Sequence, residues 1–503
     1  MKWARVSIYT VLAFTVLFII NSCGSGHKAD PVPTQIKSSD KNITAFKLSG
    51  SGLAITGVIT GTTISFTAPA GTDVTALTPA ISISAKATVS PNTNVPQDFS
   101  KDVNYTVTAE DGSTQVYKVT VTIAKAVTQV IDCANVPAVL EDRGDGVDYI
   151  IKCNINISNY KVLTIKPGVT IQFDGEGAGI TVVGGSIVGG GLKMVGTKDK
   201  PIILEGKTAK AGSWTGIQVN SKNISNQWEY VTVRDAGAGQ YAAGVLLDNS
   251  NNSPMQVSVK NCSFINNEGY GIWDYENGYA YGISIFSEFA NNTFTDNTKS
   301  ALKIKIGEAG SLDAASSYKN NTQKFIEVTG RLLLNNITVQ NIGIPYVIEQ
   351  VTELNQKMTI NSGVAFQFTK DAGFYLGYLD NGGTIIANGT AAAPIKFTGY
   401  EANIKGYWFG IELDNSDPQI EFNNCLFDGA GSIKSDTYCS GNTKAALNFG
   451  GNCGSALTGG GKVTNCTISN SGGYGINYRA GRSVTLTNNK FSGNTLADIL
   501  KRN

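Results

Sequence analysis

The stretch Gly-Val-Thr-Ile-Gln-Phe at residues 168–173 returns as Gly-Val-Ala-Phe-Gln-Phe at residues 363–368, a shift of 195 residues. Further matches lie 193 or 194 residues apart: Gly196-Thr197 with Gly389-Thr390, Trp214-Thr215-Gly216-Ile217 with Trp408-Phe409-Gly410-Ile411, and Val231-Thr232-Val233 with Cys425-Leu426-Phe427. Because these shifts are nearly constant, the pattern predicts an internal duplication.

A shorter signature recurs within both copies. It consists of Asn, a small or apolar residue, any residue and a large apolar residue, and it occurs at 261–264, 291–294, 336–339, 424–427, 465–468 and 488–491. The closest two occurrences are 23 residues apart, which predicts a solenoid with one β-coil per 20-odd residues. The second place holds Cys262, Cys425 or Cys466 in three occurrences. We expect it to point inward, with asparagines stacking into a ladder there.

The amino-acid composition and net charge exclude several classes of function. Glycine contributes 57 of 503 residues, charged residues are 16 % and hydrophobic residues are 41 %, as in a β-rich exported chain rather than a disordered one. The net charge of +1 argues against a nucleic-acid partner, which needs a basic excess. The single histidine, His27, lies in a predicted tether, so we expect no histidine-based catalysis, no metal site and no cofactor.

The N-terminus predicts export. Met1–Ser22 combines a basic start with an apolar run from Ile8 to Ile20, as in a signal peptide. The sequence Ile20-Asn21-Ser22-Cys23 resembles a bacterial lipoprotein cleavage box, which implies lipidation of Cys23 and a membrane partner. Residues 23–41 are expected to be a flexible tether. We therefore expect an envelope protein anchored to the outer membrane, with its orientation undetermined.

Residues 42–125 predict a small β-sandwich. Residues at period two, such as Tyr105-Thr106-Val107 and Tyr117-Lys118-Val119, surround a hairpin turn at Glu110-Asp111-Gly112-Ser113. The whole segment resembles an Ig-like module found at the N-terminus of bacterial surface lipoproteins. The resemblance implies a spacer or presentation role.

Residues 132–503 resemble a right-handed parallel β-helix of the pectate-lyase-like type, with approximate halves at 132–343 and 344–503. Leu163–Ile171, Gly196-Thr197 and Trp214–Ile217 carry this resemblance. The predicted fold is therefore all-β, an Ig-like sandwich followed by a duplicated β-helix. This fold hosts lyases, hydrolases, esterases and adhesins alike, so it does not define an activity.

Four cysteines predict disulfides in an exported protein. Cys133 and Cys153 lie 20 residues apart at the start of the solenoid, and Cys439 and Cys453 lie 14 apart in a loop rich in Gly, Ser and Asn. We expect local bridges 133–153 and 439–453, with free core thiols as the alternative.

Residues 270–281 hold five aromatic residues among polar ones. Exposed rings beside carboxylates and amides suit sugar binding, because ring faces pack on C–H groups and polar atoms bind hydroxyls. The candidate ligand residues are Tyr270, Trp273, Asp274, Tyr275, Glu276, Tyr279 and Tyr281. Packing of the rings on the solenoid flank is the alternative interpretation. Phe374, Tyr375 and Tyr378 form a weaker candidate patch. Trp214 and Trp408 are expected to have a structural role, such as covering a coil face, rather than to bind a ligand.

Catalytic residues are not evident in the sequence. Asp274 and Glu276 are the candidates if the protein is a polysaccharide lyase or glycoside hydrolase, and both would then have to face one groove. We expect instead a non-catalytic surface lipoprotein that binds glycan or mediates adhesion, with a polysaccharide or glycoconjugate as its partner. A purely structural envelope protein is a further alternative. The oligomeric state is left open by the sequence.

Overall fold

The computed structural model describes residues 35–502 except 51, 125–126, 145, 185–187, 249–254, 276–284, 331, 377–382, 414–418, 433–442 and 451–459. It divides into two compact units. One contains the described residues up to Phe66 and Val74–Thr122, and the other contains Thr67–Asp73 and the chain from Ile123 onward. Among the described residues the one helical element is the 3-10 helix η1 (Ile306–Gly310).

The first unit is a β-sandwich. One sheet has the order β2 (Leu53–Thr56), β1 (Ile43–Gly50), β5 (Thr78–Ile83); the other has the order β3 (Val58–Thr60), β4 (Thr63–Ala68), β8 (Thr114–Ile123), β7 (Val103–Thr108), β6 (Thr88–Ser90). The predicted hairpin between β7 and β8 is present, with Thr108 opposite Thr114. Phe46 packs edge-on against Phe66 and Tyr105, with ring centroids 5.6 and 5.1 Å away, and these rings close the core between the sheets.

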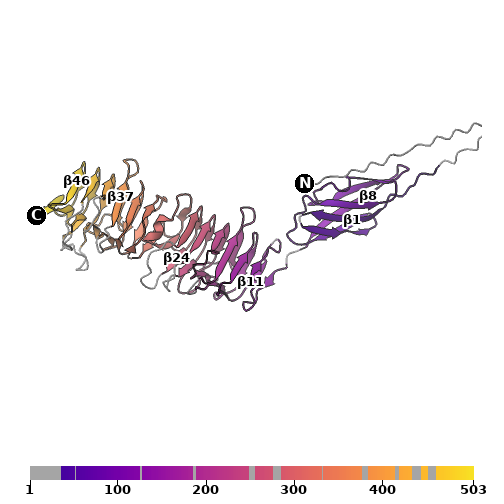
Figure 1. Cartoon of the computed structure of the whole chain (residues 1–503), viewed down its shortest axis with the longest axis horizontal. Coiled ribbons are helices and arrows are strands. Elements are labelled where there is room, and N and C mark those ends of the chain that lie inside the picture. Colours follow the sequence, from indigo (N-terminus) through magenta and orange to yellow (C-terminus); the bar gives the residue numbers. More distant parts are fainter. Residues whose placement is uncertain are drawn as a thin grey trace, which may run out of the picture. The chain divides into compact units, whose positions relative to one another are not determined.

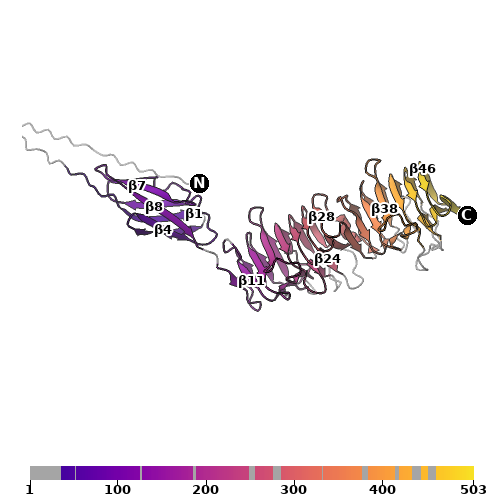
Figure 2. The same ribbon diagram turned by 180° about the vertical axis from the view of Figure 1, so that it is seen from behind.

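The second unit is a solenoid of parallel strands, stacked from β11 to β46 in Figures 1 and 2. The long sheet of 13 described strands contains β12 (Asn154–Ile157), β15 (Gly179–Val182), β18 (Gly216–Val219), β21 (Ala243–Asp248), β24 (Tyr270–Tyr275), β27 (Leu302–Lys305), β29 (Ile326–Thr329), β32 (Tyr346–Ile348), β35 (Ala365–Phe368), β38 (Ile395–Gly399), β41 (Cys425–Asp428), β44 (Thr467–Ser469) and β47 (Lys490–Ser492).

Two further sheets accompany the long sheet in the first half. The eight-stranded sheet contains β9 (Gln129–Val130), β11 (Tyr149–Ile151), β14 (Thr170–Phe173), β17 (Ile202–Gly206), β20 (Val231–Arg234), β23 (Ser263–Ile265), β26 (Thr293–Thr295) and β28 (Ser317–Asn320). The N-terminal six-stranded sheet contains β10 (Val139–Leu140), β13 (Val162–Ile165), β16 (Gly191–Val195), β19 (Gln227–Glu229), β22 (Val257–Lys260) and β25 (Phe286–Ala290).

Two other sheets replace them in the second half. The seven-stranded sheet contains β30 (Leu332–Leu333), β33 (Val351–Leu354), β36 (Gly373–Leu376), β39 (Gly410–Leu413), β42 (Ala445–Phe449), β45 (Tyr474–Arg479) and β48 (Ile499–Arg502). The C-terminal six-stranded sheet contains β31 (Ile337–Val339), β34 (Lys357–Ile360), β37 (Thr384–Asn388), β40 (Glu421–Asn423), β43 (Gly460–Thr464) and β46 (Ser483–Thr487).

Each coil contributes one strand to each of three sheets, and alternate residues fill the interior. On the long sheet, Ile180, Ile217, Val245 and Ile272 lie in register in one inward row, and each is at most 1 % exposed. This continuous row of aliphatic side chains is the core that a solenoid buries by stacking its coils. The predicted all-β fold, a sandwich followed by a parallel β-helix, is confirmed.

The second copy of the duplication is rotated by one face about the solenoid axis. β14 belongs to the eight-stranded sheet, whereas its copy β35 belongs to the long sheet. Likewise β15 belongs to the long sheet and its copy β36 to the seven-stranded sheet. The new sheets begin at β30 and β31, ahead of the boundary near residue 344 that the sequence suggests. Equivalent strands of the two copies therefore present their side chains on different faces.

The asparagine signature marks corners of the coil. Asn261, Asn291, Asn424, Asn465 and Asn488 all have φ between 49° and 57°, the left-handed region that asparagine tolerates better than most residues. The next residue then enters the core: Cys262, Cys425 and Cys466 are at most 2 % exposed. The second place of the signature is therefore an inward position, as predicted.

The expected asparagine ladder lies elsewhere. At the inward place, the Asn292 side-chain oxygen accepts a hydrogen bond from the backbone N–H of Cys262 at 3.0 Å rather than stacking on another asparagine. The ladder forms five residues further along, where Asn267 donates to Asn297 at 2.9 Å and Asn297 donates to Asn321 at 2.7 Å. Each amide there also satisfies backbone groups at a buried corner, as buried polar groups require.

Trp214 and Trp408 lie inside the solenoid, which confirms their expected structural role and places both rings in the core rather than over a coil face. Trp214 stacks on Phe173 at 3.9 Å between ring centroids, and Trp408 stacks on Phe368 at 4.3 Å. Each indole N–H donates to a backbone carbonyl, that of Arg234 at 2.8 Å or Asp428 at 2.7 Å. A partner for the indole N–H allows full burial, and the two copies share this arrangement.

Candidate functional site

Strand β24 carries aromatic side chains on the outer face of the long sheet. Trp273 lies in an outward row between Leu246 of β21 and Lys303 of β27, and Glu327 of β29 continues this row. Ile272 lies in the neighbouring inward row and is fully buried. The period-two alternation of a strand therefore places Trp273 outside while anchoring its backbone to the core.

Four rings gather at this place. The centroid of Trp273 lies 5.4 Å from that of Tyr270, 5.6 Å from that of Tyr275 and 5.8 Å from that of Tyr241, which precedes β21. The Tyr241 hydroxyl donates to the Tyr275 hydroxyl at 3.2 Å. Tyr270 is 4 % exposed, whereas Tyr241, Trp273 and Tyr275 are partly exposed. We call Tyr241, Tyr270, Trp273 and Tyr275 the aromatic cluster.

A glycine makes the cluster possible. A Cβ atom at Gly271 would lie 2.6 Å from Cδ1 of Phe294 in the core, so position 271 faces inward together with Ile272. The alternation is interrupted there, and Tyr270 contacts Trp273 three residues later on the outer side. Glycine without a side chain is what permits this close approach to Phe294.

Charged groups border the cluster. The Tyr270 hydroxyl donates to Oε2 of Glu327 at 2.8 Å, and Lys303 forms ion pairs with Glu327 and, at 3.4 Å, with Glu349. The Lys303 ammonium lies 5.6 Å from the Trp273 ring centroid, and Lys299 lies 5.0 Å from the Tyr270 ring centroid. Cations over aromatic faces are attracted by the ring quadrupole, so these lysines help to fix the rings.

Partial desolvation and the Glu327 carboxylate raise the pKa of Glu349, whose side chain is 37 % exposed, while Lys303 opposes that rise. Burial also raises the pKa of the Tyr270 hydroxyl, and the hydrogen bond to Glu327 raises it further. Tyr270 therefore stays a neutral hydrogen-bond donor at physiological pH. The border of the cluster thus combines carboxyl groups, an ammonium group and a phenol drawn from successive coils of the long sheet.

Asp274 does not share the outer face. It is in register with the core residue Leu247, its side chain is fully buried, and its carboxylate lies 3.4 Å from Nζ of Lys305. The alternation that exposes Trp273 and Tyr275 turns the residue between them inward. This arrangement sets Asp274 apart from the aromatic side chains with which the sequence groups it. Glu276, Tyr279 and Tyr281 lie outside the described residues.

The weaker patch is not exposed. Phe374 is fully buried against Phe366 and Phe368, and Tyr375 is 1 % exposed in a small cluster with Val351 and Phe409. Tyr378 lies outside the described residues. The expectation of a second exposed aromatic patch is therefore wrong for Phe374 and Tyr375, because their strand is covered on both faces.

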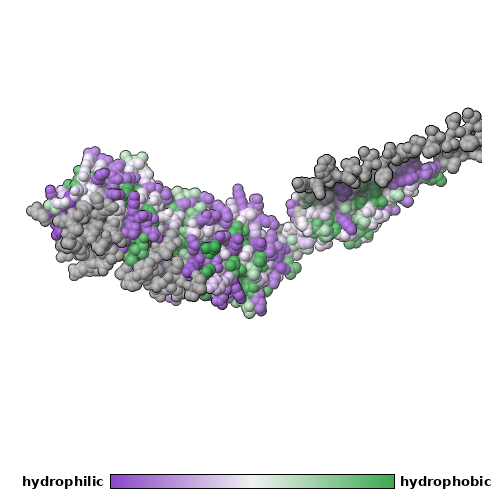
Figure 3. Space-filling view, viewed as in Figure 1, coloured by the Kyte–Doolittle hydropathy of each residue, from purple (hydrophilic) through white to green (hydrophobic). Residues whose placement is uncertain are grey.

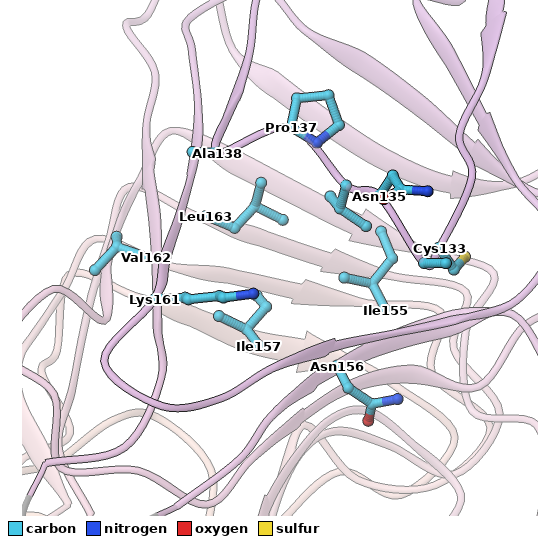
Figure 4. Close-up of a pocket in the computed structure, with 12 residues that line it drawn as sticks. Cys133, Asn135, Pro137, Ala138, Ile155, Asn156, Ile157, Lys161, Val162 and Leu163 are labelled. Atoms are coloured by element: carbon cyan, nitrogen blue, oxygen red, sulfur yellow. The ribbon is translucent and has the colours of Figure 1, made fainter.

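A disulfide joins Cys133 and Cys153, while Cys439 and Cys453 lie outside the described residues. Next to this bridge lies a cavity of about 490 Å³, shown in Figure 4. Ile155, Ile157 and Leu163 form its apolar floor, and Asn156 and Lys161 line it as well. It lies at the first coil, with no aromatic residue in its lining, and is thus separate from the aromatic cluster.

Sequence reasoning missed Tyr241, Lys303, Glu327 and Glu349. Each lies on a different segment from β24, and the unequal spacing of successive strands along the sequence hides their register.

Within the described residues, no group of His, Cys, Asp and Glu side chains could hold a metal ion. The same residues include no helix that is long and apolar enough to span a bilayer. The solenoid surface in Figure 3 intersperses hydrophilic and hydrophobic residues.

Residues 43–121 match the family model described as SGBP, N-terminal, which stands for the N-terminal domain of surface glycan-binding proteins. The match lies within the segment expected to form the sandwich and leaves the solenoid outside it. No curated protein matches the chain. The more specific relations to Ig-like modules and to pectate-lyase-like proteins stay predictions.

Three solved structures show partial or distant similarity. A candidate glycoside hydrolase from Bacteroides thetaiotaomicron is 28 % identical over 20 % of this chain and 29 % of its own, with a TM-score of 0.17. A candidate secreted protein from Bacteroides fragilis is 23 % identical over 17 % of this chain and 97 % of its own, with a TM-score of 0.14. The catalytic domain of a GH87 α-1,3-glucanase in complex with tetrasaccharides is 11 % identical over 92 % and 84 %, with a TM-score of 0.30. The chain spans less than a third of the glycoside hydrolase.

Proposed function

We propose that this chain is a surface glycan-binding protein whose sandwich presents a ligand-binding solenoid. The observation that carries the proposal is the match of residues 43–121 to the SGBP N-terminal family. The anchor belongs to the same proposal: the signal-like segment 1–22 and the lipoprotein-like box ending at Cys23 support lipidation and an outer-membrane location.

The aromatic cluster is the proposed ligand face. Trp273 and Tyr275 offer partly exposed rings for the C–H faces of sugars, and Tyr241 adds a hydroxyl that can exchange hydrogen bonds with sugar hydroxyls. The buried contacts of Tyr270 with Glu327 and Lys303 hold the neighbouring rings before a ligand arrives. Such preorganisation lowers the entropic cost of binding.

The test is retention of residues 24–503 on immobilised plant, host and bacterial polysaccharides. We expect one glycan class to bind, and Trp273→Ala with Tyr275→Ala to weaken binding about tenfold or more, since each ring contact contributes about 1 kcal/mol. Tyr160→Ala, which removes an exposed tyrosine outside the cluster, is the matched control and should bind normally. Unchanged binding by the double variant would exclude this face, and no binding to any polysaccharide would favour a purely structural role.

The two carboxyl groups beside Lys303 support glycan cleavage as a second candidate. The raised pKa of Glu349 suits a general acid, and Glu327 lies next to it. Assaying the same immobilised polysaccharides for released reducing or unsaturated ends distinguishes glycan binding from glycan cleavage. Product release that disappears in Glu349→Gln would make this an enzyme, whereas retention without release supports binding alone.

A further inference from the structure

Two cysteines occupy equivalent places on consecutive coils. Cys425 begins β41, and Cys466 directly precedes β44, whose Thr467 pairs with Leu426. The register therefore sets Cys425 beside Cys466 at the inward side of the long sheet. They are 2 % and 0 % exposed, and both are thiols in this structure. Neighbouring parallel strands lie about 4.8 Å apart, which sets the distance between the two backbones.

The first copy provides the comparison. There Cys262 is in line with Val231 on the preceding coil and Asn292 on the following one. Asn292 accepts a hydrogen bond from the Cys262 N–H, and Asn489 accepts one from the Cys466 N–H, both at 3.0 Å. The second copy thus repeats the Cys–Asn step and adds a second cysteine before it.

The two thiols have different surroundings. Burial raises the pKa of Cys425, and the Cys466 thiol raises it further. The hydrogen bond with Cys425 lowers the pKa of Cys466. In the folded chain the two thiols are therefore in hydrogen-bond contact, which places their sulfur atoms next to each other.

We propose that Cys425 and Cys466 are a cross-linking site, at which a disulfide joins two consecutive coils when the chain folds in an oxidising compartment. Their backbone separation falls within the Cα–Cα range of about 4.4–6.8 Å that disulfides adopt. The bond would enclose residues 425–466, with β42 and β43 inside the ring, and so close one complete turn of the solenoid.

The reaction needs an external disulfide of low molecular weight. The thiolate of one of the two cysteines attacks one of its sulfur atoms and releases one thiolate, which leaves a mixed disulfide on that cysteine. The thiolate of the other cysteine then attacks the sulfur of the first and displaces the second thiolate. The two cysteines lose two protons and two electrons, and the external disulfide is reduced to two thiols. Because both side chains are buried in the folded chain, the exchange takes place before the core closes around them.

Peptide mapping tests the proposal on the full chain, folded in the presence of glutathione disulfide, denatured without reduction and alkylated. Trypsin yields residues 406–434 with Cys425 and residues 463–479 with Cys466, each holding a single cysteine. We expect these two peptides as one linked species, about 2 Da lighter than their sum because two hydrogens are lost. Residues 126–143 and 153–161, joined by Cys133–Cys153, provide the positive control.

Cys262 supplies the negative control, since its peptide 261–299 should carry a single alkyl group. Cys425→Ser should leave Cys466 fully alkylated, whereas Cys262→Ser should keep the linked species. Recovery of 406–434 and 463–479 as separate alkylated peptides beside an intact 133–153 link overturns the proposal. Linkage of either cysteine to Cys439 or Cys453 overturns it as well.

Discussion

Strands β24 and β45 are equivalent segments of the two copies, yet their outer faces carry different side chains with different contacts. β24 has the sequence Tyr-Gly-Ile-Trp-Asp-Tyr and β45 has Tyr-Gly-Ile-Asn-Tyr-Arg. At the outward position Trp273 joins an aromatic cluster, whereas Asn477 is fully buried and bonded to Asn448 and Arg502. The same backbone thus supports a candidate ligand face in one copy and a structural network in the other.

The inward position after it differs too. Asp274 is paired with Lys305 inside the first copy, while Tyr478 packs against the apolar core in the second. On the seven-stranded sheet, Asn448 donates to both carboxylate oxygens of Glu412, at 3.1 and 2.9 Å. The comparison teaches that the Gly and Ile shared by these strands, together with the duplicated Trp214 and Trp408, maintain the coil. The three positions at which the strands differ, 273–275 and 477–479, determine the chemistry of their two faces.

The largest effect should come from the feature that the copies share. Replacing Trp214 or Trp408 by alanine removes a fully buried ring stacked on phenylalanine, and each change should lower the free energy of unfolding by about 3–5 kcal/mol. Urea titration followed by fluorescence measures the loss. A large loss at one tryptophan and none at the other would show that the copies are not equivalent in packing.

The second largest loss of stability should come from the inward position at which the copies differ, Asp274 in the first and Tyr478 in the second. Asp274→Ala removes the carboxylate beside Nζ of Lys305, in a site where the lysine side chain is 12 % exposed, and should cost about 2–4 kcal/mol. The double variant Asp274→Leu with Lys305→Met should recover most of that loss, because Asp274 is opposite the core residue Leu247 and a leucine can pack there. A double variant as unstable as the single one would contradict this account.

Gly271→Ala and Gly475→Ala probe the glycine of each copy. At Gly271 the new methyl group would approach the Phe294 ring to 2.6 Å; at Gly475 it would approach the Asp498 backbone oxygen to 2.6 Å and the Phe491 ring to 2.9 Å. Crowding should cost about 1–3 kcal/mol at Gly271. We expect a smaller loss at Gly475, since Asp498 is exposed and Phe491 is only partly buried, so the last coil can shift to make room. Thermal unfolding of the two variants side by side decides the order.

The smallest effect concerns pH and the border of the aromatic cluster. The pKa of Glu349 is raised above its ordinary 4.5, so the folded protein holds this proton more tightly than the unfolded chain. Stability must then fall as the pH rises from about 4.5 through the raised pKa. Glu349→Gln should remove that fall, whereas Glu268→Gln, at an exposed position, should keep it. Melting temperatures measured between about pH 4 and 8 provide the test, and parallel curves for wild type and Glu349→Gln would rule it out.

The sequence could predict the solenoid because the physical constraint repeats. An asparagine with positive φ at a corner, followed by an inward side chain, leaves the same signature on several coils. It could likewise place Trp273 and Tyr275 near one another, because they share a strand. Tyr241, Lys303 and Glu349 could not be found, because coil lengths vary and a sequence does not show which residues of different coils are in register.

The same limit applies to orientation. The sequence around Asp274 does not indicate that its carboxylate points into the core, because its ion-pair partner Lys305 lies one coil later in the chain. The tryptophans show a related limit: their repetition correctly indicates a structural role but does not show that the rings lie in the core, because the stacked phenylalanines lie on another coil.

The rotation of the second copy limits the avidity that the duplication could provide. Avidity arises when one ligand engages two sites at once, and it vanishes when geometry forbids simultaneous contact. Equivalent strands of the two copies lie on different faces, so a stiff polymer lying along the axis meets a given strand type only once. Under the proposed function, the duplication therefore lengthens the solenoid without making it bivalent.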